Sequence, residues 1–278
     1  MATPVLTTVA GRNGWEAIIA EPGTAIVVSD FDGTLSPLVD DPATSRPADG
    51  ALDALARLSE SVRQVALLTG RPALVVTELS GVNGYPGLDR LLVLGLYGLE
   101  RFDASTGTVS SDDVPAGVAA VRDRLPRVLA AAGWADAYVE DKGSSLAVHT
   151  RRLPDPDAAL AGLRKPLAEL ADAEGLRLEP GNLVLELRPP GVEKGSALRR
   201  LVETTGARSV LYAGDDLGDL AAYNAVEAMR PEGLAAVLVA ARSSGVAELT
   251  VRADIVVDDP AGVVTVLTAL ADAIGART

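Results

Sequence analysis

Short apolar runs alternate with stretches of helical spacing along the first hundred residues. Residues 25–29 form an apolar run that is rich in isoleucine and valine, as buried parallel strands are, and residues 65–68 and 91–95 repeat the pattern. Between the first two runs, residues 52–62 carry leucine or valine at every third or fourth position, which predicts a helix. This alternation predicts a doubly wound, Rossmann-like α/β core with a parallel sheet.

The pattern changes between residues 109 and 189. Two helical stretches alternate there with two pairs of strand-like segments, at 114–132, 137–142, 146–151, 155–174, 176–180 and 183–188. Paired strands with short turns predict an antiparallel sheet with helices on one face. We therefore expect an α+β cap domain over 109–189, inserted into a core formed by 1–108 and 190–278.

The alternation of strands and helices resumes at residue 194. The pattern predicts helices at 194–205, 218–229 and 261–274, and strands at 209–213, 235–240 and 254–257. The two parts of the core must pair in space, so residues near 30, 69, 194 and 215 can meet at the carboxyl ends of neighbouring strands. Open α/β sheets bind their ligands at that edge.

Composition excludes several classes of protein. The chain has 278 residues and a formal net charge of −13, which argues against a nucleic-acid or anionic-membrane surface. It has no cysteine and one histidine, His149, so disulfides, zinc–thiolate sites, cysteine nucleophiles and histidine-rich zinc sites are excluded. His149 receives no chemical role. The sequence also lacks the G-x-S-x-G, P-loop and G-x-G-x-x-G motifs.

No segment of the sequence predicts membrane insertion or secretion. The N-terminus lacks a basic stretch followed by a sustained apolar core, and the longest apolar run, 234–241, is too short to cross a bilayer. We expect a cytoplasmic protein.

Asp30 and Asp32 follow the first strand in the order D-F-D-G. Alternate residues of a strand point to the same side, so both carboxylates can face one site, and Gly33 allows a sharp turn after them. Two carboxylates this close repel unless a cation or a shared proton relieves the charge. The same pattern also occurs where Asp-Gly merely ends a strand in a turn.

A second acidic cluster follows the strand predicted at 209–213. Asp215, Asp216 and Asp219 lie within five residues, although one acid would suffice to cap the next helix. Oxygen ligands without histidine or sulfur favour Mg²⁺, and Mn²⁺ and Co²⁺ share this coordination. We therefore expect a magnesium site.

Groups that could bind an anion occur elsewhere. Thr69, Gly70 and Arg71 follow a strand and offer a hydroxyl, backbone amides and a helix N-terminus, which suit a phosphate, although such segments often only join a strand to a helix. Lys194 begins a predicted helix and could offset the clustered acids near a phosphate, or lie in solvent.

Together these segments resemble the four ordered motifs of the haloacid dehalogenase-like phosphatases. The motifs are D-F-D-G-T-L at 30–35, T-G-R at 69–71, Lys194, and G-D-D-L-G-D at 214–219. More narrowly, the chain resembles the trehalose-6-phosphate phosphatases of the actinobacterial type, through G-L-Y-G-L-E at 95–100, E-D-K-G at 140–143, H-T-R at 149–151 and E-L-R-P at 186–189. The likeness covers about residues 24–270. Gly218 and Leu220 replace the family's usual threonine and glutamate, which weakens the expected support of the metal.

The resemblance implies a role for each core residue. Asp30 would attack phosphorus to give an aspartyl-phosphate, and Asp32 would act as acid and base. Thr69 and Lys194 would hold the phosphoryl oxygens, with Gly70 and Arg71 also contacting the substrate. Mg²⁺ would be held by Asp30, the Asp32 carbonyl and Asp215, with Asp216 and Asp219 in support. The residue pattern alone does not say which acid is the nucleophile.

In the cap, the resemblance implies that sugar recognition belongs to Glu140, Lys142, Arg151 and Glu186. Without the resemblance, these charged residues would indicate only a sheet face exposed to solvent. The implied activity is magnesium-dependent hydrolysis of trehalose 6-phosphate. The implied partner is a small sugar phosphate, with neither nucleic acid nor membrane, and a monomer is the default expectation. The alternatives are a sucrose-phosphate or mannosyl-phosphoglycerate phosphatase, a phosphosugar mutase, or a sensor without catalysis.

Overall fold

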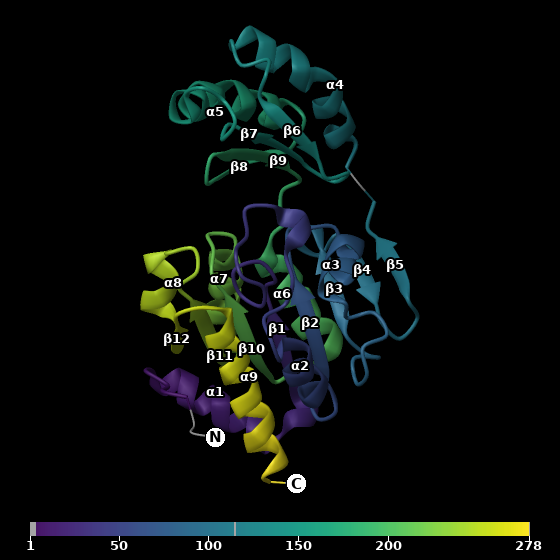
Figure 1. Cartoon of the computed structure of the whole chain (residues 1–278), viewed down its shortest axis with the longest axis vertical. Coiled ribbons are helices and arrows are strands. Elements are labelled where there is room, and N and C mark those ends of the chain that lie inside the picture. Colours follow the sequence, from purple (N-terminus) through teal and green to yellow (C-terminus); the bar gives the residue numbers. More distant parts are fainter. Residues whose placement is uncertain (1–3, 114, 278) are drawn as a thin grey trace. The chain divides into compact units, whose positions relative to one another are not determined.

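A computed structural model describes residues 4–113 and 115–277, which form two compact units (Figure 1). The core unit comprises Met1–Ser111 and Glu193–Thr278, and the cap unit comprises Asp112–Val192. The predicted boundaries fall three residues before the observed ones at each end. At the first boundary the reason is that Thr108–Ser111 pairs as an edge strand within the core sheet. Residue 114, where a helix was predicted to begin, lies outside the described residues.

The core unit contains an eight-stranded mixed sheet in the order β12-β11-β10-β1-β2-β3-β4-β5. Six strands are parallel, and β4 and β5 run antiparallel at one edge. The strands are β1 (Ala25–Ser29), β2 (Gln64–Leu68), β3 (Leu92–Gly95), β4 (Glu100–Asp103), β5 (Thr108–Ser111), β10 (Ser209–Gly214), β11 (Ala235–Ala241) and β12 (Ile255–Val257). The sheet order places β1, whose end carries Asp30, between β10 and β2.

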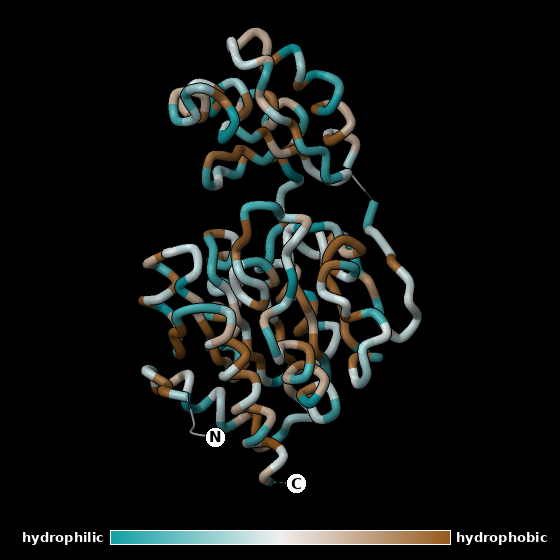
Figure 2. Tube along the Cα trace, viewed as in Figure 1, coloured by the Kyte–Doolittle hydropathy of each residue, from teal (hydrophilic) through white to brown (hydrophobic). Residues whose placement is uncertain are grey.

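Helices cover both faces of this sheet, because alternate residues of each strand point to opposite sides. Val27 packs into the hydrophobic cluster on one face, whereas Ile26 and Val28 pack into the cluster on the other. The first face is covered by α1 (Val9–Ala20), α2 (Ala51–Ser59), α3 (Ala73–Ser80) and α9 (Pro260–Gly275), and the second by α6 (Lys194–Thr205), α7 (Asp219–Met229) and α8 (Ala247–Arg252). Apolar stretches, brown in Figure 2, recur through the interior of the core unit. The doubly wound core predicted from the sequence is confirmed.

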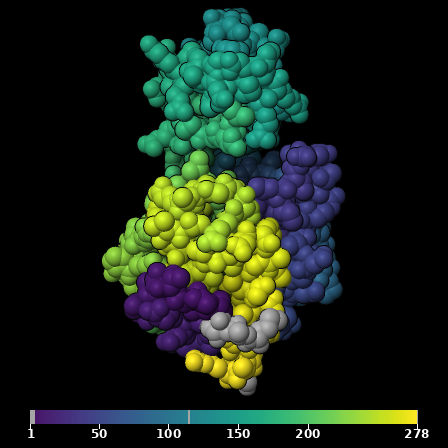
Figure 3. All heavy atoms as spheres, turned by 60° about the vertical axis from the view of Figure 1, so that its left-hand side comes forward, coloured from purple at the N-terminus to yellow at the C-terminus, as the bar shows by residue number. Residues whose placement is uncertain are grey.

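Three elements of the core were not predicted: helix α1, helix α8 and the β4–β5 hairpin. In α1 the glycines Gly11 and Gly14 lower helix propensity and mask the pattern. Gly14 is required there, because a Cβ atom would lie 2.3 Å from the carbonyl oxygen of Ala236 in β11. The helix packs against β11 and α9, so the N-terminal and C-terminal segments lie side by side (Figure 3).

The cap unit is a four-stranded antiparallel sheet with two helices. Its strands follow the order β6-β7-β9-β8, and its elements are α4 (Ala116–Ala131), β6 (Tyr138–Asp141), β7 (Leu146–His149), α5 (Pro156–Ala173), β8 (Arg177–Gly181) and β9 (Val184–Arg188). Leu146 and Leu187 lie in one hydrophobic cluster with Leu163 of α5, so one face of the sheet is the core of this unit. The other face carries Glu140, Glu186 and Glu179 in one register row with Ala147 between the first two.

Short 3₁₀ turns complete the described secondary structure, at Pro22–Thr24, Pro42–Thr44, Leu96–Gly98 and Arg230–Glu232. None of the helices in the described part of the chain combines the length and the apolar character that crossing a membrane requires.

The buried carboxylate of Asp254 ties the N-terminal segment to the C-terminal strands. The carboxylate of Asp254 is inaccessible to solvent and accepts hydrogen bonds from the hydroxyl of Thr8, the Arg230 guanidinium (2.6 Å) and the Leu238 amide (2.8 Å). Since a buried carboxylate needs its partners, this cluster is costly to break.

We therefore expect Asp254→Ala to lower the free energy of unfolding of the core unit by about 3 kcal/mol, because it removes the carboxylate partner of the Arg230 guanidinium and of the Leu238 amide. The measurement is guanidinium denaturation followed by Trp15 fluorescence in a Trp134→Phe background, which removes the tryptophan of the cap unit. The control is Asp258→Ala, which breaks the exposed pair with Arg242 and should change stability by less than about 1 kcal/mol. Equal losses in the two variants would contradict the role given to Asp254.

Candidate active site

Three buried carboxylates meet at the carboxyl edge of the core sheet. Asp30 directly follows β1 and Asp215 directly follows β10, and these strands are parallel neighbours, so their ends lie together. Asp219, at the start of α7, joins them: one carboxylate oxygen of each residue lies within 4.8 Å of the others. The side chains of Asp30 and Asp219 are 6% and 0% exposed. Two acidic segments 185 positions apart in the chain therefore form one site.

Lys194 neutralises part of this charge. It is the first residue of α6, its side chain is 3% exposed, and its Nζ lies 3.0 Å from Asp30 Oδ1, 2.7 Å from Asp219 Oδ1 and 3.7 Å from Asp216 Oδ1. Burial alone would lower the pKa of Lys194, but Asp219 and Asp30 outweigh it and raise the pKa well above its usual value. The lysine is therefore held as a cation.

The pKa values of the nearby acids reflect the same competition. Burial raises the pKa of Asp30 well above its usual value, while Lys194 opposes the shift and the neighbouring carboxylates add to it. Burial also raises the pKa of Asp215, to about 7, and the pKa of Asp219. Asp216 differs, since its side chain is 54% exposed and Lys194 lowers its pKa despite partial desolvation. The raised pKa values show that the cluster contains more acidic groups than one lysine can keep ionised.

Asp219 accepts hydrogen bonds at both carboxylate oxygens. Oδ1 accepts from Lys194 and from the hydroxyl of Tyr212 (2.5 Å), and Oδ2 accepts from the backbone amides of Asp215 (2.9 Å) and Asp216 (3.0 Å). A carboxylate offers about four acceptor positions, so little capacity is left for a direct metal bond. Asp219 orients Lys194 and the turn before α7. Tyr212, seven residues before Asp219, was not predicted to take part in the site. Its position near the end of β10 is the one feature of the sequence that indicated it.

Asp215 is held by two hydroxyls. Its Oδ1 accepts a hydrogen bond from Thr34 Oγ1 (2.9 Å) and its Oδ2 accepts one from Ser244 Oγ. Gly33, with φ of +77°, allows this approach, because a Cβ atom there would lie 2.1 Å from Asp215 Oδ2. Neither hydroxyl was assigned from the sequence. Ser244 follows β11 at the same sheet edge, which was the available signal.

Asp32 forms a two-point ion pair with Arg71. The Arg71 Nε and Nη2 atoms lie 2.6 Å from Asp32 Oδ2 and Oδ1, and the Ser45 hydroxyl also donates to Oδ1 at 3.1 Å. Arg71 Nη1 donates to the carbonyl of Pro42 at 2.8 Å. Sequence reasoning placed Arg71 on the substrate; here its guanidinium fixes the carboxylate of Asp32, which is 30% exposed.

Thr69 and Gly70 lie at the end of β2, next to the end of β1. Thr69 is buried, and its hydroxyl accepts a hydrogen bond from the Arg71 amide (3.1 Å). A Cβ atom on Gly70 would lie 2.7 Å from the Tyr97 hydroxyl, so glycine allows the two loops to pack closely. The Tyr97 amide donates to the Thr69 carbonyl at 2.9 Å. The segment 95–100 thereby stabilises the loop at 69–71, which is expected to bind phosphate.

The donor atoms of this cluster fit a divalent cation such as Mg²⁺. They are carboxylate oxygens, which hard cations prefer, and three buried acids, Asp30, Asp215 and Asp219, face one buried lysine. A divalent ion would relieve that excess of negative charge. Asp30 and Asp215 are the two residues of the three that are free to bind it directly.

The expected sugar-binding residues lie in the cap unit, which we describe by itself. Glu186, in β9, is 7% exposed and accepts hydrogen bonds from Ser145 Oγ (2.6 Å) and Lys142 Nζ (3.2 Å). Glu140, in β6, lies 3.0 Å from His149 Nε2. Arg151 is exposed in the turn after β7. The first two carboxylates thus share the polar face of the cap sheet and are held by neighbouring side chains.

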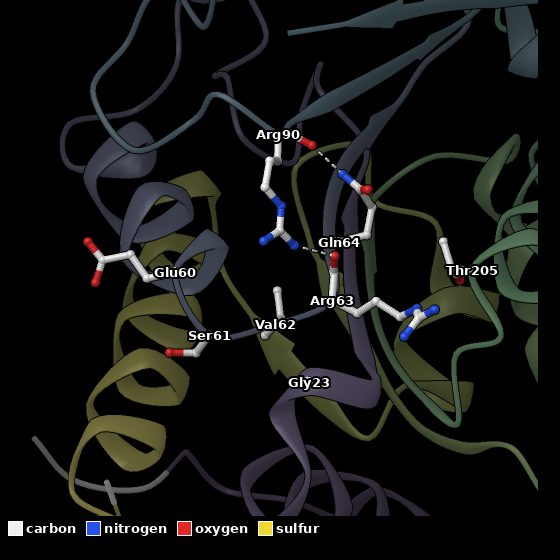
Figure 4. Close-up of a pocket in the computed structure, with 8 residues that line it drawn as sticks. All are labelled: Gly23, Glu60, Ser61, Val62, Arg63, Gln64, Arg90 and Thr205. Atoms are coloured by element: carbon white, nitrogen blue, oxygen red, sulfur yellow. Dashed lines mark hydrogen bonds between the residues drawn. The ribbon is translucent and has the colours of Figure 1, made fainter. Parts of the chain in front are cut away.

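A separate cavity of about 540 Å³ lies at the opposite, amino edge of the core sheet (Figure 4). Its lining residues are Gly23, Glu60, Ser61, Val62, Arg63, Gln64, Arg90 and Thr205. Arg90 donates to the carbonyl of Arg63 (2.8 Å), and Glu60 is the one carboxylate among the lining residues that the structure describes. The cavity therefore lacks the clustered acids found at the carboxyl edge of the sheet. We take the carboxyl edge as the candidate active site.

Comparison with known proteins agrees with this geometry. Residues 28–251 match the family model described as trehalose-phosphatase. The chain is 33% identical over 215 residues to the trehalose-phosphate phosphatase of Mycobacterium avium, covering 75% of this chain and 53% of that protein. It is also 33% identical over 217 residues to an uncharacterized glycosyl hydrolase of Mycobacterium tuberculosis, and this match covers 72% of this chain and 15% of that protein. The chain thus spans about half the length of the first relative and less of the second.

Among solved structures, the C-terminal domain of Candida albicans trehalose-6-phosphate phosphatase superposes with a TM-score of 0.72 over 98% of both chains, at 22% identity. A haloacid dehalogenase-like hydrolase from Bacteroides thetaiotaomicron superposes with a TM-score of 0.64. The chain therefore has the fold of the haloacid dehalogenase-like hydrolases. Within that class, the chain belongs to the trehalose-phosphatase family.

The position of Lys194 between two buried acids leads to a stability prediction. Lys194→Met leaves Asp30 and Asp219 without their cation, so we expect the free energy of unfolding to fall by about 3 kcal/mol near neutral pH, read from Trp15 fluorescence during denaturation in the Trp134→Phe background. Because the pKa of Lys194 is raised above its usual 10.5, its contribution is fully present below that pH and is lost only as the pH rises through the raised value. The control, Lys165→Met, removes an exposed lysine and should have little effect. Similar unfolding midpoints for the two variants would argue against a charged Lys194.

Proposed function

We propose that this protein is a magnesium-dependent phosphatase that hydrolyses trehalose 6-phosphate to trehalose and phosphate through an aspartyl-phosphate on Asp30. The observation that carries the proposal is the meeting of Asp30 and Asp215 beside Lys194 at the carboxyl edge of the sheet. Membership of the trehalose-phosphatase family, together with relatives of that name, supports the choice of substrate.

In the first step, a carboxylate oxygen of Asp30 attacks the phosphorus atom. A bond forms between Asp30 and phosphorus, and the bond between phosphorus and the sugar oxygen breaks. Asp32 gives its proton to the departing sugar oxygen. In the structure both carboxylate oxygens of Asp32 accept from Arg71, and Ser45 also donates to one of them, so Asp32 is oriented as a carboxylate. The pair with Arg71 must open at one oxygen before Asp32 can carry the proton that it gives.

In the second step, water attacks phosphorus in the aspartyl-phosphate. Asp32, now a carboxylate, takes a proton from the water, and the bond between phosphorus and Asp30 breaks. Phosphate leaves and the Asp30 carboxylate is restored. Asp32 thus regains from water a proton in place of the one that it gave to the sugar oxygen, so the cycle is balanced.

The groups around Asp30 have different tasks. Thr69 and Lys194 would contact phosphoryl oxygens, and Lys194 also keeps Asp30 and Asp219 in place. Asp30, Asp215 and the carbonyl of Asp32 would hold Mg²⁺, while Asp216 and Asp219 support the turn. When bound, the ion would polarise a phosphoryl oxygen and reduce the repulsion between carboxylate and phosphate.

Recognition of the sugar is assigned to the polar face of the cap sheet. Glu140, Lys142, Arg151 and Glu186 supply charged hydrogen-bonding groups, and Ser145 and Lys142 already orient Glu186. The substrate is a small sugar phosphate, so neither nucleic acid nor a membrane enters the proposal. A cytoplasmic location stays a prediction.

The activity is tested by phosphate release from trehalose 6-phosphate with and without Mg²⁺, beside sucrose 6-phosphate, mannosyl-phosphoglycerate and glucose 6-phosphate. We expect release that requires the metal and prefers trehalose 6-phosphate. Equal turnover of all four would remove the assignment of the substrate. Isomerised sugar without phosphate release would indicate a mutase, and binding without turnover would indicate a sensor.

Asp30→Asn should abolish the reaction, with kcat reduced at least about 1,000-fold, because the amide cannot act as the nucleophile. Acid-quenched wild type incubated with phosphorus-labelled substrate should retain a label that hydroxylamine removes, as expected for an acyl phosphate, and the variant should retain none. Asp216→Asn makes the same change of charge at the exposed acid of the cluster and should lose far less activity. A labelled, active Asp30→Asn variant would exclude the covalent route.

Glu186→Ala tests the cap. We expect kcat/KM for trehalose 6-phosphate to fall by roughly 10- to 100-fold, from lost hydrogen bonds to sugar hydroxyls, and p-nitrophenyl phosphate to be far less affected. The matched control is Glu179→Ala, which removes a carboxylate from the same register row in the next strand. Glu186→Gln keeps the size of the side chain if the alanine variant folds poorly. Parallel losses on both substrates would move Glu186 out of sugar recognition.

A further inference from the structure

The loop after β11 contacts both acidic segments of the site. Residues 242–245, with the sequence R-S-S-G, connect β11 to the residues before α8, at the carboxyl edge where β11 pairs with β10. Ser243 Oγ donates to the carbonyl of Gly33 at 2.5 Å, and Ser244 Oγ donates to Asp215 Oδ2. One serine therefore holds the turn that follows Asp32, and the next holds the carboxylate of Asp215.

The loop is itself anchored. The amide of Arg242 donates to the carbonyl of Val257 in β12 (3.0 Å), and the Gly245 amide closes a turn onto the carbonyl of Arg242 (3.1 Å). The two hydroxyls thus project from a backbone that the sheet holds at one end. Because this backbone is held by the sheet, the hydrogen bond from Ser244 restricts the orientation of the Asp215 carboxylate.

The hydrogen bonds leave Asp215 able to bind a cation. Each carboxylate oxygen has two acceptor positions; Thr34 uses one on Oδ1 and Ser244 uses one on Oδ2. One position on each oxygen is left, and the plane of the carboxylate is fixed by the donors on its two sides. Partners that orient a metal ligand in this way commonly change metal affinity by 10- to 100-fold.

We propose that Ser244 is a positioning residue that orients Asp215 toward the divalent ion, and that Ser243 keeps the loop in register with the turn at Gly33. The inference rests on the proposed function, since it assumes that Asp215 binds the metal. In this chain, support of the metal ligand comes from the loop after β11 and from Thr34.

The decisive pair of variants is Ser244→Thr and Ser244→Val, which have the same shape and differ in the hydroxyl group. The readout is binding of Mg²⁺ alone, without substrate, by isothermal titration calorimetry, together with the unfolding temperature without metal. We expect Ser244→Thr to bind Mg²⁺ like the wild type, and Ser244→Val and Ser244→Ala to bind it roughly 10- to 100-fold more weakly. Unfolding without metal should change little, because Ser244 is exposed.

Two further variants locate the effect. Ser243→Ala should weaken Mg²⁺ binding less than Ser244→Ala, since it acts through the loop. Ser61→Ala, in the loop before β2 and away from the acids, should leave the affinity unchanged. Equal Mg²⁺ affinity for the threonine and valine variants overturns the inference. If that result occurs while the wild type hydrolyses trehalose 6-phosphate with Mg²⁺, the role of Ser244 fails and the proposed function stands.

Discussion

The site depends on one buried cation between carboxylates that come from distant parts of the chain. Lys194 contacts Asp30, at the end of β1, and Asp219, at the start of α7, and its side chain is almost inaccessible to solvent. Without it, the ends of β1 and β10 would bring uncompensated negative charges together in a region of low dielectric. The parallel pairing of these strands and the position of α6 are therefore electrostatically linked: the sheet brings the acids together, and the helix supplies the charge that lets them stay.

A set of hydroxyl groups surrounds the charged residues and fixes their orientation. Thr34 and Ser244 hold Asp215, Tyr212 holds Asp219, and Ser45 helps Arg71 to hold Asp32. These donors are neutral, so they orient the acids without cancelling the negative charge that attracts a metal ion. The chemistry requires charged carboxylates at the site, and the neutral hydroxyl donors fix the orientation of those carboxylates.

The fold was largely predictable because its strands are short and apolar and are separated by amphipathic helices. The elements missed are those in which tertiary contacts override local signals. Helix α1 contains Gly14 because the backbone of Ala236 in β11 lies too close for a side chain. The β4–β5 hairpin has little apolar alternation, because its outer strand, Thr108–Ser111, is an exposed edge. The first predicted domain boundary fell inside that strand for the same reason.

The sequence by itself determined the chemical character of this protein: acids after two strands, a lysine at the start of a helix, and no cysteine for other chemistry. Residue types and their positions at strand ends are local properties, so they can be read along the chain. Only the tertiary structure decided which partner each group has. It paired Arg71 with Asp32, gave Asp219 a supporting position, and brought Ser244 to Asp215. The residues in those contacts lie 25 to 39 positions apart in the chain and meet only when the sheet and its helices have packed. Which donor then binds which acid depends on side-chain geometry, which no local pattern encodes.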